Sequence, residues 1–302
     1  MKKQNMSKKG LMPALLGAVC SVVALTSVSY AWFTIGNEAS VGDIDVNVEA
    51  ADGMLISADG ETWTKSLDLD SLIGEGINQL PGENTKLAPV SSAANVVDGV
   101  QEIFYGEKDT TLLGREAVAG TEYLVFDLYV KVDHDKDLSI AQSSTVTDVV
   151  GSDTNASLAS RVSFVNLGSV LADDNYSAED DLPDLGSDVD TTAVVWEPNS
   201  TSHLSTVQAS GKVDYKGIAS VAEPAAEESL GATTLSTDDV ATSDNTATGG
   251  LKVADLEDGV NKIRVYIWLE GQDVDCTNDI AEGAFSVSLD FVVTDPVTTE
   301  EE

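Results

Sequence analysis

Three carboxylates alternate along the segment Asp133-His134-Asp135-Lys136-Asp137, directly after a long run with the pattern of a strand. Carboxylate oxygens are the ligands that hard cations such as Ca²⁺ prefer. The segment is not an EF-hand loop, because Leu138 stands where that loop needs its turn glycine. We predict a calcium site at Asp133, Asp135 and Asp137, and a solvated acidic turn is the simpler alternative.

A later loop offers a second set of carboxylates. Asp273, Asp275 and Asp279 lie between two strand patterns near the end of the chain. Their spacing is less regular than that of the first segment. They form a weaker candidate for the same kind of ion, again with a solvated acidic loop as the alternative.

Side chains suited to catalysis are sparse. The two histidines, His134 and His203, lie in separate segments, and neither a His-Glu-x-x-His zinc motif nor a Gly-x-Ser-x-Gly turn occurs. Cys276 would need a histidine brought close by the fold to act as a nucleophile, and a small buried side chain is the simpler interpretation. In so acidic a chain, carboxylates at glycosidase spacing arise by chance. We therefore expect no enzymatic activity.

The first 31 residues have the pattern of an export signal. An apolar run from Leu11 to Val28 is followed by the small-x-small sequence Ser29-Tyr30-Ala31, and is preceded by the basic residues Lys2, Lys3, Lys8 and Lys9. Cleavage after Ala31 would leave a mature chain that begins with Trp32 and lies outside the cell or on its surface. Contact with the membrane would then be confined to residues 1–31 before cleavage.

Two other interpretations of this segment stay open. An uncut signal anchor would keep the protein in the membrane, although the apolar run is near the lower length limit for a span. The pair Lys9-Gly10 resembles the processing site of type IV pilin-like precursors, whose mature chain would begin at Leu11. The acidic residue usual near the start of such pilins is missing here.

Composition restricts the partners. The chain has 16 Lys and Arg residues against 52 Asp and Glu residues, a net charge of −36, and it repels nucleic acid and anionic lipid. This balance is typical of a secreted or surface protein, and a halophilic proteome would produce it too. Beyond the leader, Cys276 is the single cysteine, so no intrachain disulfide can form.

Alternation of apolar and polar residues predicts several strands. The clearest patterns cover residues 44–48, 123–132, 263–269 and 285–293, and shorter apolar runs cover 162–165 and 193–196. The amphipathic helices of a βαβ pattern are missing. We predict an all-β fold, an antiparallel β-sandwich of the jelly-roll kind with minor helices and long acidic loops. We expect the last two strands to form an antiparallel pair.

The strand patterns place one β-sandwich domain at residues 32–296, after the signal peptide at 1–31. Two polar stretches interrupt it, near 173–190 and 222–250. Because they have few large apolar residues to offset the entropy of ordering the backbone, we expect solvated insertions. Residues 297–302 form an acidic tail that we expect to be loose.

Both ends of the chain resemble the TasA/camelysin-type proteins of Gram-positive bacteria. The resemblance lies in Tyr30-Ala31-Trp32-Phe33-Thr34, in the strand from Ile44 to Val48 and in the closing Phe285-Ser-Val-Ser-Leu-Asp-Phe291. It covers about a third of the chain. It implies a jelly-roll subunit of extracellular fibres in a biofilm matrix, joined when the N-terminal segment of one subunit adds a strand to the next.

On this interpretation the donor segment is Trp32 to Val48, which meets other copies of the same chain and other matrix or envelope components. The residues expected to fill the acceptor are Trp32, Phe33, Ile44, Val46 and Val48. The main alternative is a monomeric adhesin or acidic ion-binding envelope protein, in which this strand pairs inside its own sandwich. A camelysin-like metalloprotease is a further alternative that lacks its zinc motif here.

Overall fold

A computed structural model describes residues 46–68, 87–105, 113–149, 155–170, 189–204, 215–222, 231–277 and 284–296. The chain divides into two units, Met1–Asn37 and Glu38–Glu302, and every described residue belongs to the second. The leader, the acidic tail and most of the predicted insertion at 173–190 lie outside the described residues. So do Trp32, Phe33, Ile44 and Asp279.

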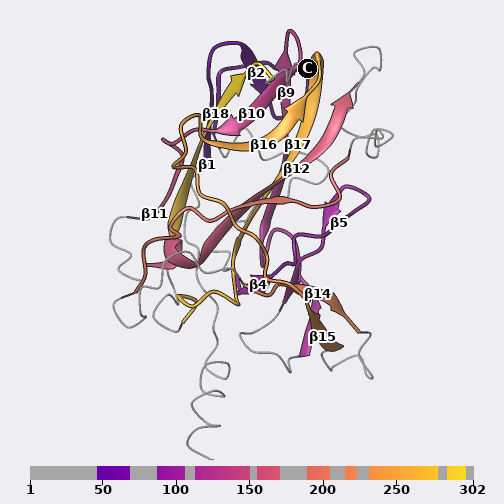
Figure 1. The fold of residues 1–302 in the computed structure, drawn as a ribbon, viewed down its shortest axis with the longest axis vertical. Coiled ribbons are helices and arrows are strands. Elements are labelled where there is room, and N and C mark those ends of the chain that lie inside the picture. Colours follow the sequence, from indigo (N-terminus) through magenta and orange to yellow (C-terminus); the bar gives the residue numbers. More distant parts are fainter. Residues whose placement is uncertain are drawn as a thin grey trace, which may run out of the picture. The chain divides into compact units, whose positions relative to one another are not determined.

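The described part of the chain is all-β, as predicted, with three main sheets (Figure 1). Sheet A has the order β16-β10-β18-β1-β3, and β11 also pairs with β18. Its strands are β16 (Leu251–Leu256), β10 (Lys136–Ile140), β18 (Phe285–Thr294), β1 (Val46–Ala50), β3 (Ser66–Leu67) and β11 (Thr145–Asp148).

Sheet B contains the longest strands and has the order β13-β12-β17-β9-β2, with antiparallel pairing throughout. Its strands are β13 (Val194–Trp196), β12 (Ser160–Val170), β17 (Gly259–Leu269), β9 (Leu124–Val132) and β2 (Met54–Ser57). The short 3₁₀ helix η1 (Ala156–Ala159) leads into β12.

Sheet C is built from short strands in the order β14-β15-β8-β7-β4. They are β14 (Ile218–Val221), β15 (Gly231–Leu235), β8 (Leu113–Glu116), β7 (Phe104–Tyr105) and β4 (Val90–Ser91). A separate hairpin joins β5 (Val96–Val97) to β6 (Val100–Gln101). Both residues of its turn have positive φ, 50° at Asp98 and 75° at Gly99, as a two-residue hairpin turn of this twist requires.

Sheets A and B pack face to face as a β-sandwich. Phe164 of β12 meets Phe291 of β18 edge to face, with ring centroids 5.9 Å apart, and both are buried. Alternate residues of β18, from Phe285 to Phe291, point into this core, as the period-2 pattern predicted.

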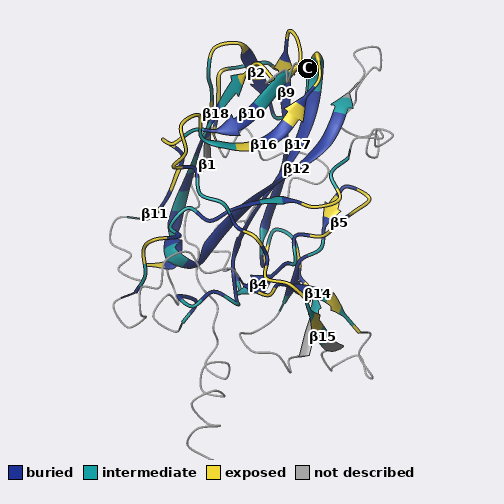
Figure 2. Cartoon of the chain, viewed as in Figure 1, coloured by how far each residue is buried: buried dark blue, intermediate teal, exposed yellow. Residues whose placement is uncertain are grey.

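The opposite face of sheet B is buried too. Val125, Val165, Tyr266 and Trp268 pack there against residues of sheet C, of the β5–β6 hairpin and of the intervening loops. Figure 2 shows β9, β12 and β17 in the dark blue of buried residues along most of their length. Sheet B is therefore the middle layer of the described structure.

Two expectations were wrong. The last two strands do not pair with each other, because β17 lies in sheet B and β18 in sheet A. The second concerns the predicted solvated stretch 222–250: residues 231–250 supply β15 and the buried residues Val240, Thr242 and Asn245, although most other residues from 233 to 250 are intermediate or exposed. Small apolar and hydroxyl side chains can pack on a large sheet face that already supplies the apolar area.

The aromatic contact between sheets A and B gives a test of the sandwich. Phe291→Ala should lower the free energy of unfolding by about 3–5 kcal/mol, because it removes a buried ring and leaves a cavity. Chemical denaturation would measure it, with Val118→Ala, which is 51% exposed, as the control expected to change little. A loss at Phe291 as small as that of the control would contradict this packing.

Candidate functional site

The carboxylates of the predicted calcium site contact different partners. Asp133 forms an ion pair with His134 at 2.7 Å, Asp135 accepts the backbone N–H of Asp258 at 3.1 Å, and Asp137 pairs with Lys252 at 3.0 Å. Within the described ranges, no group of three or more His, Cys, Asp or Glu side chains is arranged to hold a metal ion. Calcium binding at Asp133, Asp135 and Asp137 stays a prediction.

The described part of the predicted donor segment is Val46 to Val48, the first three residues of β1. It runs parallel to β18, with Val46 opposite Val287 and Val48 opposite Leu289, and its other edge pairs with the two-residue strand β3. The Val48 side chain is fully buried. In the single chain, β1 is therefore part of its own sheet, and Val46 lies beside the beginning of β18.

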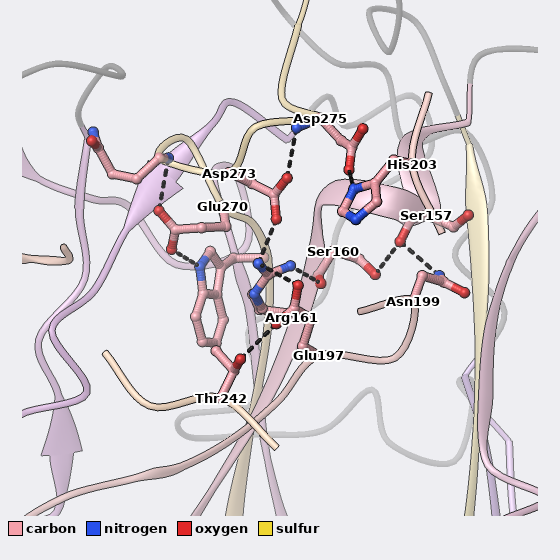
Figure 3. A network of polar contacts seen from close by, with 12 residues as sticks. Ser157, Ser160, Arg161, Glu197, Asn199, His203, Thr242, Glu270, Asp273 and Asp275 are labelled. Atoms are coloured by element: carbon pink, nitrogen blue, oxygen red, sulfur yellow. Dashed lines mark hydrogen bonds and ion pairs between the residues drawn. The ribbon is translucent and has the colours of Figure 1, made fainter. Parts of the chain in front are cut away.

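A network of buried charges occupies one end of sheet B (Figure 3). Arg161 of β12 is fully buried and forms ion pairs with Asp273 and, at 3.1 Å, with Glu197. The guanidinium also lies 5.5 Å from the ring centroid of Tyr215. Glu197 accepts a 2.5 Å hydrogen bond from the Thr242 hydroxyl. One arginine thus links three segments that are far apart in the sequence.

The same network continues through the loop that follows β17. Asp273 accepts the backbone N–H of Asp275 at 2.7 Å, and the Asp275 carboxylate pairs with His203 at 2.6 Å. Asp275 also accepts the backbone N–H of Leu204 at 2.9 Å. Two carboxylates of the weaker predicted ion site therefore bind Arg161 and His203.

Glu270 is the most unusual member of the network. It is fully buried and accepts hydrogen bonds of 2.9 Å from the Trp268 indole N–H and from the backbone N–H of Gln272. Burial outweighs these bonds and raises the pKa of Glu270 to about 7. This carboxyl can therefore change its charge near neutral pH.

A second buried cluster lies farther along sheet B. Arg264 of β17 donates two hydrogen bonds, of 2.7 and 3.1 Å, to the carboxylate of Asp127 in β9. Lys262 forms an ion pair with the same carboxylate at 2.9 Å. Arg264 also donates to the carbonyl of Gly99 in the β5–β6 turn at 3.1 Å. The cluster ties the hairpin to the sheet, because the guanidinium bridges the two.

Sequence reasoning missed Arg161, Asp127 and Arg264 as buried residues. They alternate with apolar residues in strands, the position usually turned toward solvent. A signal was nevertheless present: Tyr266 and Trp268 share the alternate positions of β17 with Arg264. Large aromatic residues on the polar face of a strand indicate that this face is covered.

A groove of about 740 Å³ lies between β12 and β16. Its lining combines apolar side chains with carboxylates and lysines, and includes Asn166, Val189, Asp190, Lys252, Asp255 and Glu257. Lys252 is bound to Asp255 at 2.6 Å. A volume of this size is typical of ligand-binding pockets.

Comparisons of the chain with protein-family models, with curated proteins and with solved structures found no match. No helix within the described ranges is long and apolar enough to cross a membrane.

Arg161 gives a test of the buried network. Arg161→Met should lower the free energy of unfolding by about 3–5 kcal/mol, because it leaves Asp273 and Glu197 buried without their cation. Denaturant unfolding would measure it. Lys65→Met is the matched control, since it breaks the exposed ion pair with Asp52 and should change stability little. Equal effects of the two changes on the free energy of unfolding would contradict the role of Arg161 in neutralising Asp273 and Glu197.

The raised pKa of Glu270 predicts how the free energy of unfolding depends on pH. Because the folded-state pKa of Glu270 is raised from 4.5 to about 7, the folded state holds this proton more tightly than the unfolded state. The contribution of protonated Glu270 to the free energy of unfolding is therefore full below about pH 4.5 and is lost as pH rises toward 7. The change is about 3 kcal/mol, because each pKa unit corresponds to 1.36 kcal/mol. Unfolding free energies measured from pH 4.5 to 8 for the parent and for Glu270→Gln should show this fall in the parent alone. An unchanged slope in the variant would show that another group titrates.

Proposed function

We propose that this chain is a secreted structural subunit of an extracellular fibre, which polymerises when its N-terminal segment adds a strand to the next copy. The observation that carries the proposal is the position of β1. A parallel ladder from Val46 to Ala50 holds β1 against β18, and Val48 is buried. The described end of the donor segment, Val46 to Val48, is thus held in sheet A of its own chain.

The composition of that segment supports strand donation. Trp32, Phe33 and Ile44 are large apolar residues that a neighbouring subunit can bury, and backbone hydrogen bonds would supply the affinity. Val46 and Val48, which were also predicted to fill the acceptor, pair with β18 of their own chain and would instead anchor the donor segment there. The strongly acidic surface favours a location outside the cell, where salt and divalent cations screen its charge.

One observation favours a second candidate, a monomeric cell-surface adhesin or acidic envelope protein. Because β1 completes its own sheet between β18 and β3, the sandwich needs no strand from another copy in order to close. The two candidates share the same leader and the same strands.

Protein secreted by its native host distinguishes them. N-terminal sequencing and negative-stain microscopy would be carried out with and without millimolar Ca²⁺. Filaments whose subunits begin at Trp32 are expected for the fibre subunit. Discrete particles beginning at Trp32 would instead favour the monomeric protein, and a mature chain beginning at Leu11 would favour the pilin-like alternative.

Removing the donor segment should separate folding from assembly. A mature chain that begins at Val46 keeps β1 and should unfold with nearly the parent free energy, but it should form no filaments. A second variant of full length that carries Trp32→Ala and Phe33→Ala should also assemble poorly, and the parent chain is the control that forms filaments. Filaments formed by the shortened chain would rule out strand donation by residues 32–45.

The calcium prediction is tested in the same assay. Changing Asp133, Asp135 and Asp137 together to Asn should remove any dependence of filament formation on Ca²⁺, because the amide carbonyls bind the ion less tightly than carboxylates do. Asp238 and Asp239, an exposed acidic pair elsewhere, are the control positions. A calcium response that survives in the triple variant would place the ion elsewhere.

A further inference from the structure

Sheet C is attached to sheet B at the end of β17, where Glu270 follows the last residue of the strand. β4 is a terminal strand of sheet C, and its residue Val90 forms a parallel β-bridge with Glu270. The backbone N–H of Gly271 donates to the Val90 carbonyl at 2.7 Å. Glu270 therefore lies in a hydrogen-bonded junction between the two sheets.

The segment that leads into β14, the other terminal strand of sheet C, reaches the same place. Tyr215 is buried, and its hydroxyl lies beside the Glu270 carboxyl. Two residues later, Gly217 packs so closely on the chain after β4 that a Cβ would lie 2.0 Å from the Ser92 carbonyl oxygen. Ser91 of β4 is fully buried and also lies beside Glu270. Both edges of sheet C thus meet at one carboxyl group.

The buried charges around Glu270 do not balance. Arg161 is fully buried and interacts with three buried carboxyl groups, those of Glu197, Glu270 and Asp273 (Figure 3). Glu197 and Asp273 form ion pairs with the guanidinium. If all three carboxyl groups were ionised, this site would carry two excess negative charges. Because a buried, unbalanced charge is costly, we expect the carboxyl group that depends least on Arg161 to keep a proton.

The partners of Glu270 fit a neutral acid. Its oxygens accept hydrogen bonds from the uncharged N–H groups of Trp268 and Gln272, both at 2.9 Å. In the part of the chain that the structure describes, the buried hydroxyls of Ser91 and Tyr215 form no hydrogen bond of normal geometry. A protonated carboxyl group can donate to one of these oxygens, which a carboxylate cannot do. Burial raises the pKa of Tyr215 well above 10, so this hydroxyl stays neutral.

We propose that Glu270 is a pH switch that controls the attachment of sheet C to sheet B. With its proton bound, Glu270 holds β4 and residues 215–222 against the end of β17. Loss of the proton adds a buried negative charge, and hydration of that charge opens these two segments while sheets A and B stay folded. Local opening of this kind requires less free energy than global unfolding. The switch is independent of the proposed fibre function.

Hydrogen exchange at pH 6 and pH 8 tests the switch, with rates converted to protection factors so that the pH dependence of the chemical step cancels. The pKa of Glu270 is about 7 in the closed state and 4.5 when exposed, so the opening constant should rise roughly tenfold over this range. Residues 87–92 and 215–222 should lose protection by this factor. Residues 54–64 are the internal control, because β2 pairs with the opposite end of β9 from β17's last residues.

A substitution that cannot ionise should abolish the response. In Glu270→Gln, residues 87–92 and 215–222 should have the same protection factors at pH 6 and pH 8. Glu61→Gln, at an exposed carboxyl group in the turn after β2, is the matched control and should behave like the parent. Circular dichroism would verify that both variants are folded.

A measurement on the parent protein needs no substitution. Carbon-13 NMR of labelled glutamate carboxyl groups should show one resonance that titrates near pH 7, with the midpoint at which residues 87–92 lose protection. This result decides the proposal even if Glu270→Gln does not fold.

Three results would overturn the switch. A single protection factor shared by residues 87–92 and β18 would mean that only global unfolding responds to the proton. A pH response that persists in folded Glu270→Gln would assign it to another group. Glutamate carboxyl groups that all titrate below pH 6 would show that Glu270 is ionised at neutral pH. None of these measurements depends on filament formation, so the proposed function is tested separately.

Discussion

The burial of sheet B on both faces is the constraint on which the rest of the structure depends. A sandwich needs one buried face per sheet, but β12, β17 and β9 bury both. Charged residues on the second face, such as Arg161 and Arg264, then lose their water. Burying an unpaired charge costs several kcal/mol, so each guanidinium requires carboxylates close by. The loops that cover this face must therefore place their carboxylates next to the buried arginines.

The loops after β13 and β17 illustrate this dependence. The first brings Glu197 and His203 to the network, and the second brings Glu270, Asp273 and Asp275. The described residues contain one cysteine, Cys276, so no disulfide between them fixes such loops. Ion pairs shielded from water take that role here, because they are screened little by salt. This suits a protein whose surface carries a large negative charge.

Local patterns allowed the strands to be predicted, but not their neighbours. β9, β17 and β18 follow from period-2 alternation, since each has at least one apolar face. The placement of β17 and β18 in different sheets depends on long-range packing that no local pattern records. The covering role of residues 231–250 was missed for a related reason: Val240 and Thr242 are buried because sheet B supplies the apolar area opposite them. The groove could not be predicted from the sequence either, because it lies between β12 and β16, which belong to different sheets.

The parallel pairing of β1 with β18 joins the two ends of the described chain. A hairpin partner can form as soon as its turn is made, whereas β1 must wait until almost the entire domain has been synthesised. During that time the edge of β18 lacks this partner. Once β1 is paired, its ladder runs from Val46 opposite Val287 to Ala50 opposite Phe291. The same pairing therefore places the first and the last described strands side by side inside sheet A, where each has a further strand on its other edge.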